Sequence, residues 1–388
     1  MHNPFEDSPV NVLPLSLTNE AAYIHHNKSD QAHKLLRLLA DLSNQKRQGV
    51  LSGQNAGHSI QFTDPQCIMG YHHNFQRIIN LTGQTPAILS VDYEHDQYTP
   101  PEYLSSTNRK LIEHANLGGM ITINWSPLSP WLNDGLDLVN ARGSWLDART
   151  PAVGGNANFI ALRDLLDPLS PIHEVWIRKL DHIANALDEL NRSKVAVLWR
   201  PMQEMNGHWF WWGASHSDEY AALWRHMHQY FTQVKKLNNL LWVYSPAGFS
   251  TQSTDTILGS MCHYPGDDLV DIIAPTSYSD DLLVKDYENL SSVNKPIALA
   301  EYGPAASGPT LIPHLITAAP TFNAQMYAER LKQNYPRIAY WVSWNSFYSG
   351  EETKIYKYSL ADCQNTTELF ADEYVVSLTN LARFNDQI

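Results

Sequence analysis

Cysteine is scarce in this chain: three occur among 388 residues, at Cys67, Cys262 and Cys363. They lie far apart and form no Cys-x-x-Cys pair, so we expect no metal centre built on cysteine, and at most one disulfide can form. The 17 histidines do not change this expectation, because no His-Glu-x-x-His motif is present and adjacent pairs such as His72-His73 do not face one site on a helix. We therefore expect neither a metal nor a cofactor.

Long apolar runs and excess positive charge are also missing. No stretch of about 20 apolar residues is present, so no transmembrane helix is expected. The first residues lack the basic and apolar regions of a signal peptide. The 27 Lys and Arg residues are outnumbered by 40 Asp and Glu, which gives a formal net charge of −13. An acidic protein lacks the basic face that nucleic acids and anionic membranes attract, so we expect neither as a partner.

Aromatic residues, by contrast, are abundant, with 12 tryptophans and an aromatic fraction of 11%. Four aromatics follow one another at residues 209–212, shortly after Glu204 and Asn206. The apolar run 194–198 before them is typical of a buried strand, and we expect Arg200-Pro201 to end its ladder, because proline has no N–H to donate. Clustered tryptophans in a loop usually cover a core or stack on a ligand. Glu204, at the carboxyl end of this strand, is therefore a candidate functional residue.

A second glutamate stands in a matching position. The run 295–303 is another short apolar strand, and Glu301 lies near its carboxyl end. Two carboxyl groups at the ends of two strands, ringed by aromatics, suit glycoside hydrolysis: one protonates the leaving oxygen, and the other attacks the anomeric carbon or activates water. The alternative is two unrelated surface glutamates.

Strand-like runs alternate with helical stretches, which is the pattern of a parallel barrel. Eight such runs are present, at residues 49–54, 87–93, 119–125, 194–198, 240–246, 271–278, 295–303 and 338–345. The fold class that we expect is α/β, a single (β/α)₈ TIM barrel over residues 1–388 with loop insertions on its catalytic face. Its parts are an irregular leader at 1–30, an insertion at 126–171 and a closing helix at 366–388.

Glu204 follows the fourth predicted strand and Glu301 lies at the end of the seventh, and in an eight-stranded barrel these ends face each other across the axis. Other strand ends on the same face carry residues that suit a sugar-binding cleft, although each aromatic alone is as compatible with core filling. These residues are Asp92, Trp125, Tyr244, Tyr278 and Trp344.

The segment 200–213, with Arg200-Pro201-x-x-Glu204-Met205-Asn206-Gly207 followed by Trp209-Phe210-Trp211-Trp212-Gly213, resembles the signature of glycoside hydrolase family 26. The segment 264–271 and the strand end 300–303 are similar to that family as well. The resemblance implies a retaining (β/α)₈ glycosidase, most often a β-mannanase, with Glu204 as the acid/base and Glu301 as the nucleophile. It also implies that Tyr278 hydrogen-bonds the nucleophile and that Trp209 and Trp344 line the subsites. Gln203, Asn206 and Trp212, from the same motif, complete the set of expected substrate-binding residues.

Two departures from the family pattern concern the sugar. Many members have histidine before the acid/base glutamate and after the third-strand tryptophan, where this chain has Gln203 and Ser126. A glutamine amide can still donate to a sugar hydroxyl, but it does not titrate near neutrality. We expect a secreted, monomeric endo-β-1,4-mannanase. A mixed-linkage glucanase, a β-1,3-xylanase, a non-catalytic carbohydrate-binding barrel and an interaction protein stay open as alternatives.

Overall fold

The structure is a computed structural model. It describes residues 28–58, 62, 64–67, 70–93, 101–131, 161–207, 209–213, 217–250, 257–304, 322–348 and 355–382. The expected leader lies almost entirely outside these ranges, as does most of the expected insertion.

Eight parallel strands close into a barrel. In chain order they are β2 (Gly53–His58), β3 (Ile88–Asp92), β4 (Met120–Trp125), β5 (Val197–Pro201), β6 (Leu240–Tyr244), β8 (Ile272–Ile273), β10 (Ile297–Gly303) and β11 (Ile338–Ser343). Each strand pairs with the next, and β11 pairs back with β2 through Ser343 and Gln54, which closes the ring. The predicted (β/α)₈ fold is confirmed.

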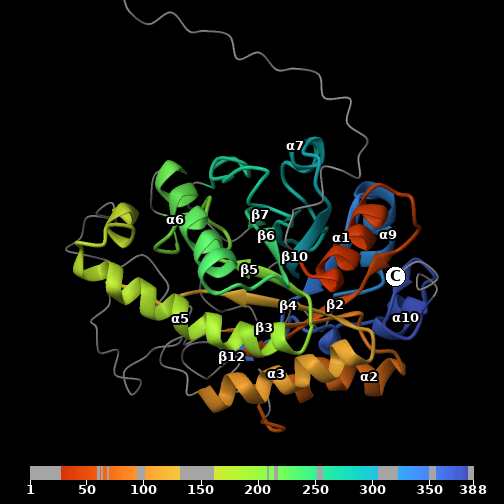
Figure 1. The fold of residues 1–388 in the computed structure, drawn as a ribbon. Coiled ribbons are helices and arrows are strands. Elements are labelled where there is room, and N and C mark those ends of the chain that lie inside the picture. The colour runs from red at the N-terminus through yellow and green to blue at the C-terminus, as the bar shows by residue number, and fades with distance from the viewer. Residues whose placement is uncertain are drawn as a thin grey trace, which may run out of the picture.

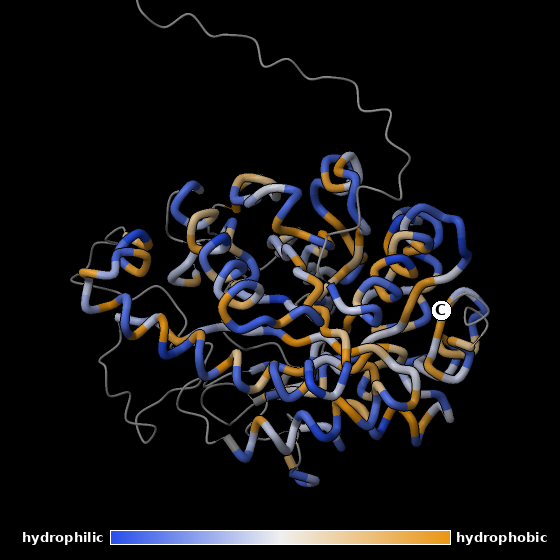
Figure 2. Tube along the Cα trace, in the orientation of Figure 1, coloured by the Kyte–Doolittle hydropathy of each residue, from blue (hydrophilic) through white to orange (hydrophobic). Residues whose placement is uncertain are grey.

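Helices lie between the strands and surround them (Figure 1). They are α1 (Asp30–Ser43), η2 (His72–Gln76), α2 (Arg77–Thr82), α3 (Pro101–Asn116), η4 (Leu162–Leu165), α5 (Pro171–Arg192), α6 (Ser217–Gln229), η5 (Tyr230–Val234), α7 (Tyr287–Ser292), α9 (Met326–Asn334), η6 (Leu360–Asp362) and α10 (Thr366–Ala371). Hydrophobic and hydrophilic stretches alternate along α5, as expected for a helix with one face on the barrel (Figure 2). None of the helices in the described ranges is long and apolar enough to cross a membrane.

Side chains of the barrel strands alternate between two hydrophobic clusters. In β5, Val197 and Trp199 belong to the cluster that the surrounding helices α3, α5 and α6 share, whereas Leu198 belongs to the cluster that contains the α1 leucines. The strands are thus buried on both faces, as parallel strands usually are. Ser29 starts α1, since its hydroxyl accepts a hydrogen bond from the Ala32 N–H at 3.2 Å. The buried leucines of α1 then pack against the inner side chains of the barrel.

The C-terminal segment differs from the expected closing helix over 366–388. Helix α10 has only six residues, and the chain then forms the short strand β14 (Val375–Val376), which pairs in parallel with β1 (Val50–Leu51). Two adjacent β-branched valines fit a strand better than a helix, and this pairing buries both of them. The prediction of one domain over the whole chain is not tested.

β5 ends at Pro201, as the sequence predicts, after Arg200 and Pro201 have both paired with β4. Arg200 and Pro201 continue β5 in register with Asn124 and Trp125 of β4. The Met202 N–H donates to the Trp125 carbonyl at 2.9 Å, so the alternation of the strand turns the Pro201 nitrogen away from β4. The pairing between β5 and β6 has already ended at Trp199, and the missing N–H therefore breaks no ladder bond.

Candidate active site

Glu204 lies in a tight turn three residues beyond the end of β5. Its φ is +57° and that of Met202 is +47°, both in the left-handed region that non-glycine residues rarely adopt. The Glu204 N–H donates to the Ser245 carbonyl at 2.7 Å, and its own carbonyl accepts from the Gly207 N–H at 3.0 Å. Such a backbone costs about 1–3 kcal/mol and persists where surrounding contacts hold it, most often at functional sites.

Within the described ranges, the donors to the Glu204 carboxyl group are neutral. The Thr276 hydroxyl donates to Oε1 at 2.6 Å, and the Trp209 indole N–H donates to Oε2 at 2.9 Å. Burial, and after it the charge of Glu301, raises the pKa of Glu204 to about 7, against the lowering effect of these two hydrogen bonds and of Arg200. Glu204 is therefore substantially protonated near neutral pH and has a proton to donate.

The Glu301 carboxylate, in β10, is held by a cation and a phenol. The Arg200 guanidinium donates to Oε2 at 2.8 Å, and the Tyr278 hydroxyl donates to Oε1. Arg200 is fully buried and Glu301 is nearly so. Gly303 is required beside them, because a Cβ at this position would lie 2.7 Å from the Tyr278 ring. These contacts hold the Glu301 carboxylate in one orientation.

Arg200 and Thr276 link the two glutamates. Arg200 is a residue of β5, and its guanidinium donates hydrogen bonds to the side chains of Asn124 and Ser245. It also donates to Glu301 in β10. Thr276, in the short strand β9 (Thr276–Tyr278), pairs in register with Glu301 and donates to Glu204. Neither was among the predicted site residues. Arg200 had a signal, as the first residue of the family motif, whereas Thr276 had none beyond its place two residues before Tyr278.

Besides Tyr278, two of the predicted aromatics lie at the carboxyl groups. Trp209, which is 9% exposed, donates to Glu204, and Trp344 follows β11 with its ring centroid 6.0 Å from the Arg200 Cζ. Trp344 is partly exposed, so its ring is available to a ligand.

Three other predicted aromatics are fully buried, which corrects the expectation that they stack on sugar. Trp125 is stacked between Trp176 and Trp199, with ring centroids 5.8 and 6.0 Å away. The Trp212 indole N–H donates to the Gln203 carbonyl at 2.8 Å, and the Tyr244 hydroxyl also donates to a backbone carbonyl. These rings point into the packing behind the site and support the loop that carries Glu204.

The predicted polar residues also include some that face the site and some that support it from behind. Asn206 is fully buried and bonds to the backbone of Ala247, so it braces the turn rather than facing a ligand. Asp92, at the end of β3, lies 3.8 Å from the His58 ring.

Gln203 donates to the Ser126 hydroxyl at 2.7 Å, so the two departures from the family pattern contact each other. The Gln203 Oε1 atom is buried and accepts no hydrogen bond from the residues that the structure describes.

Among the described residues, no group of three or more His, Cys, Asp or Glu side chains is placed to hold a metal ion. His95 and His208 lie outside the described residues.

The barrel and its carboxyl pair define a class of protein. A protonated carboxyl group and an anchored carboxylate at the carboxyl ends of opposite strands of a (β/α)₈ barrel are the machinery of a glycoside hydrolase. The chain belongs to glycosyl hydrolase family 26, whose family model matches residues 24–376.

Several relatives are similar over most of this chain. A mannan endo-1,4-beta-mannosidase A and B from Caldalkalibacillus mannanilyticus is 32% identical over 383 residues, covering 94% of this chain and 65% of that protein. A mannan endo-1,4-beta-mannosidase from Bacillus subtilis (strain 168) is 29% identical over 352 residues, covering 85% of this chain and 84% of that protein. The solved structure of Bacillus subtilis mannanase man26 matches with a TM-score of 0.69 and 26% identity, covering 91% of this chain and 93% of that one.

Proposed function

We propose that this chain is a retaining endo-β-glycanase that hydrolyses β-1,4-mannan by double displacement. The observation that carries the proposal is the contrast between the two carboxyl groups: Glu301 is paired with Arg200, whereas Glu204 is buried among neutral donors with its pKa raised to about 7. One group is prepared to attack and the other to donate a proton. Relatives that are named mannan endo-1,4-beta-mannosidases supply the proposed substrate.

In the first step, a Glu301 carboxylate oxygen attacks the anomeric carbon. The glycosidic C–O bond breaks, and its oxygen takes the proton of Glu204. Arg200 and Tyr278 hold the attacking carboxylate in a fixed direction, which lowers the entropic part of the barrier. The products are a glycosyl ester on Glu301 and a free sugar chain.

In the second step, Glu204, now ionised, takes a proton from water. The resulting hydroxide bonds to the anomeric carbon, and the ester bond to Glu301 breaks. Two inversions at one carbon leave the β configuration unchanged. Thr276 and Trp209 donate to Glu204, and these bonds strengthen when the carboxyl group becomes charged, so they assist the first step.

We propose that Gln203, Trp209 and Trp344 contact the sugars on either side of the cut bond, with Asp92 farther along the cleft. The Gln203 Oε1 atom, which has no donor among the described residues, is an acceptor for one sugar hydroxyl. Mannose carries an axial hydroxyl at C2, and a residue next to the acid/base glutamate is well placed to recognise it. A buried acceptor discriminates between sugars because a wrong sugar leaves it unpaired.

A panel of polysaccharides under one set of conditions tests the substrate: mannan, galactomannan, mixed-linkage glucan and both xylans. We expect reducing sugar from the mannans, and proton NMR of the first product should show the β anomer. Release from glucan or xylan with none from either mannan overturns the substrate while leaving the two-glutamate mechanism in place. No release from any polymer favours the non-catalytic barrel, and an α anomer in the first product overturns retention.

We also propose that the protein acts outside the cell as a monomer. A mannan chain is too large to enter a cell, so the enzyme must meet it in the medium. Activity confined to the cell fraction of an expressing culture contradicts the location, and an elution volume of a dimer in gel filtration contradicts the monomer.

A further inference from the structure

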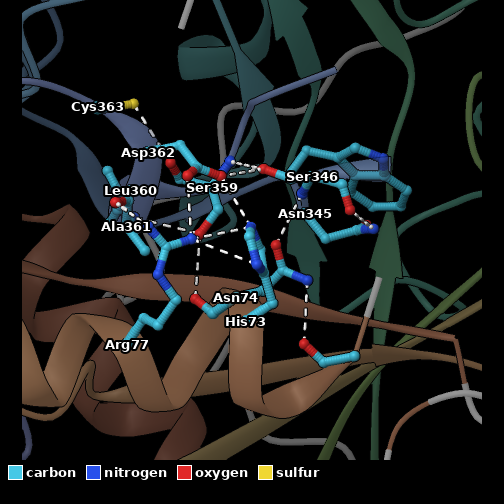
Figure 3. A network of polar contacts seen from close by, with 12 residues as sticks. His73, Asn74, Arg77, Asn345, Ser346, Ser359, Leu360, Ala361, Asp362 and Cys363 are labelled. Carbon is cyan, nitrogen blue, oxygen red and sulfur yellow. Dashed lines mark hydrogen bonds and ion pairs between the residues drawn. The ribbon is translucent and has the colours of Figure 1, made fainter. Parts of the chain in front are cut away.

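The mechanism above gives no role to the carboxylate of Asp362. Asp362 lies in η6, beyond the last barrel strand, and its side chain is 7% exposed. Its Oδ2 accepts from the Ser346 hydroxyl at 2.7 Å and lies 3.1 Å from His73 Nε2, while Oδ1 accepts from Arg77 at 3.0 Å. Figure 3 shows these side chains pointing toward one another from three separate segments. A buried carboxylate is costly without its partners, so Asp362 fixes these segments to each other.

Ser346 makes hydrogen bonds through both its hydroxyl and its backbone N–H. Its hydroxyl donates to Asp362 and accepts from the Ser359 N–H at 3.1 Å, and its own N–H donates to the Asn74 side chain at 2.8 Å. Gln54 holds the same segment two residues earlier, because its amide donates to the Trp344 carbonyl at 3.0 Å. Residues 344–346, which follow β11, are therefore clamped from both ends.

The helix that supplies part of this clamp has an unusual form. η2 (His72–Gln76) is a π-helix, a rare form that is frequent at functional sites, although η5 (Tyr230–Val234), outside the site, has the same form. It presents His73 toward Asp362 and Asn74 toward two segments at once, since the Asn74 carbonyl also accepts from the Ser359 hydroxyl at 3.1 Å. The rare helix form coincides with the residues that hold the loop.

The clamped segment leads directly to the reacting groups. Trp344 lies over the Arg200 guanidinium, and Arg200 donates to Glu301. The backbone N–H of Trp344 also donates at 2.8 Å to the backbone carbonyl of Tyr302, the residue after Glu301. A shift of Trp344 thus disturbs the cation that anchors the nucleophile and the backbone next to it.

We propose that Asp362 is a positioning residue: acting through Ser346, it holds Trp344 over Arg200 and so keeps the cleft wall beside Glu301 in its working geometry. The proposal rests on the proposed function of Glu301. It assigns no contact between Asp362 and substrate.

A double-mutant cycle tests this path: Asp362→Asn, Trp344→Ala and the double variant, each compared with the unchanged chain. We measure kcat and KM on whichever glycan the unchanged chain cleaves best. We also measure calorimetric Kd for a mannan hexasaccharide, with every member of the cycle carrying Glu204→Ala so that the ligand is not cleaved. Asp362→Asn should lower kcat/KM about tenfold, as the loss of a well-placed cation–π contact does, and weaken binding. In the Trp344→Ala background the same change should alter either quantity less than twofold.

Asp271→Asn is the matched control. Asp271 is also a buried carboxylate, paired with Lys28 at 2.8 Å, but it precedes β8 at the amino end of the barrel. This variant should lose thermal stability and keep kcat and KM. Equal loss of kcat/KM in the control, or an equal effect of Asp362→Asn in both backgrounds, overturns the proposal.

If Asp362→Asn does not fold, Ser346→Ala takes its place in the cycle, because it removes the link to the loop and leaves the pairing of Asp362 with Arg77 intact. Absence of turnover on every glycan overturns the proposed function alone, since the cycle in Kd still shows whether Asp362 and Trp344 act together.

Discussion

Glu301 faces a full positive charge, whereas Glu204, at the same end of the same barrel, faces neutral donors. Arg200 and the Tyr278 hydroxyl hold Glu301, and Thr276 holds Glu204 in a buried turn. Burial raises the pKa of Glu204 to about 7, and the charge of Glu301 adds to that rise. The two side chains are chemically identical, so the partners that each fold segment supplies decide which one donates a proton and which one attacks. Exchanging or removing those partners is the way to test the contrast.

Glu301→Ala should have the largest effect. Without the nucleophile, no glycosyl ester forms, so kcat should fall by about 10⁵-fold or more on every substrate, whatever its leaving group. Initial rates on mannan and on an activated aryl glycoside give the measurement. Appreciable turnover of the activated glycoside would assign the nucleophile to another residue.

Glu204→Ala should have a smaller effect that depends on substrate. General acid catalysis contributes about 10²–10⁴-fold, so hydrolysis of polymer should fall by that factor. An aryl glycoside with a good leaving group needs no proton and should keep forming the ester, and added azide should accelerate its release. If azide has no effect, or if Glu301→Ala responds to it equally, the two roles are misassigned.

Arg200→Gln should weaken the fold and the reaction together. It leaves the buried carboxylate of Glu301 without its cation, which we expect to lower the free energy of unfolding by about 3–5 kcal/mol. Urea unfolding measures this loss. Arg200→Lys is the control: it keeps the charge but not the planar fork, so it should recover stability only in part. Full recovery by lysine would show that charge alone matters.

Thr276→Val should have the smallest effect, on pH dependence. The Thr276 hydroxyl stabilises the charged form of Glu204, so its removal should raise the pKa of Glu204 above about 7. The active form is protonated, and kcat/KM is lost as pH rises through this pKa. The alkaline limb should therefore move to higher pH, by up to about one unit.

Thr232→Val is the control for Thr276→Val, since its hydroxyl donates to the His228 carbonyl at 2.7 Å in η5, outside the site. The alkaline limb of the kcat/KM–pH profile of Thr232→Val should coincide with that of the unchanged chain. A limb that stays in place in Thr276→Val contradicts the assignment of Glu204 as the acid.

The sequence was sufficient for the barrel and for the two carboxyl groups. Apolar, β-branched runs recur at intervals that leave room for a helix, and the barrel topology then places the end of the fourth strand opposite the end of the seventh. The position of Glu204 and Glu301 follows from that count, and the raised pKa of Glu204 follows from the aromatic residues around it.

Side-chain direction could not be predicted in the same way. A tryptophan at a strand end points to the cleft or to the surrounding helices depending on its register, and Trp125 is enclosed by Trp176 and Trp199. The crossing of Arg200 to Glu301 depends on barrel closure, which no local pattern encodes. Likewise, β14 replaces the expected terminal helix because β1 offers an unpaired edge, a feature that only the folded sheet shows.

The left-handed backbone of Glu204 has a consequence for how this sequence changes under selection. Glycine is the residue that tolerates φ near +57° without strain, and it would also remove a buried carboxyl group from beside Glu301. Glycine would relieve the backbone strain, but it would also leave a cavity and two donors, on Thr276 and Trp209, without their acceptor. Selection for stability alone therefore has no single direction at this position, whereas selection for chemistry retains the glutamate.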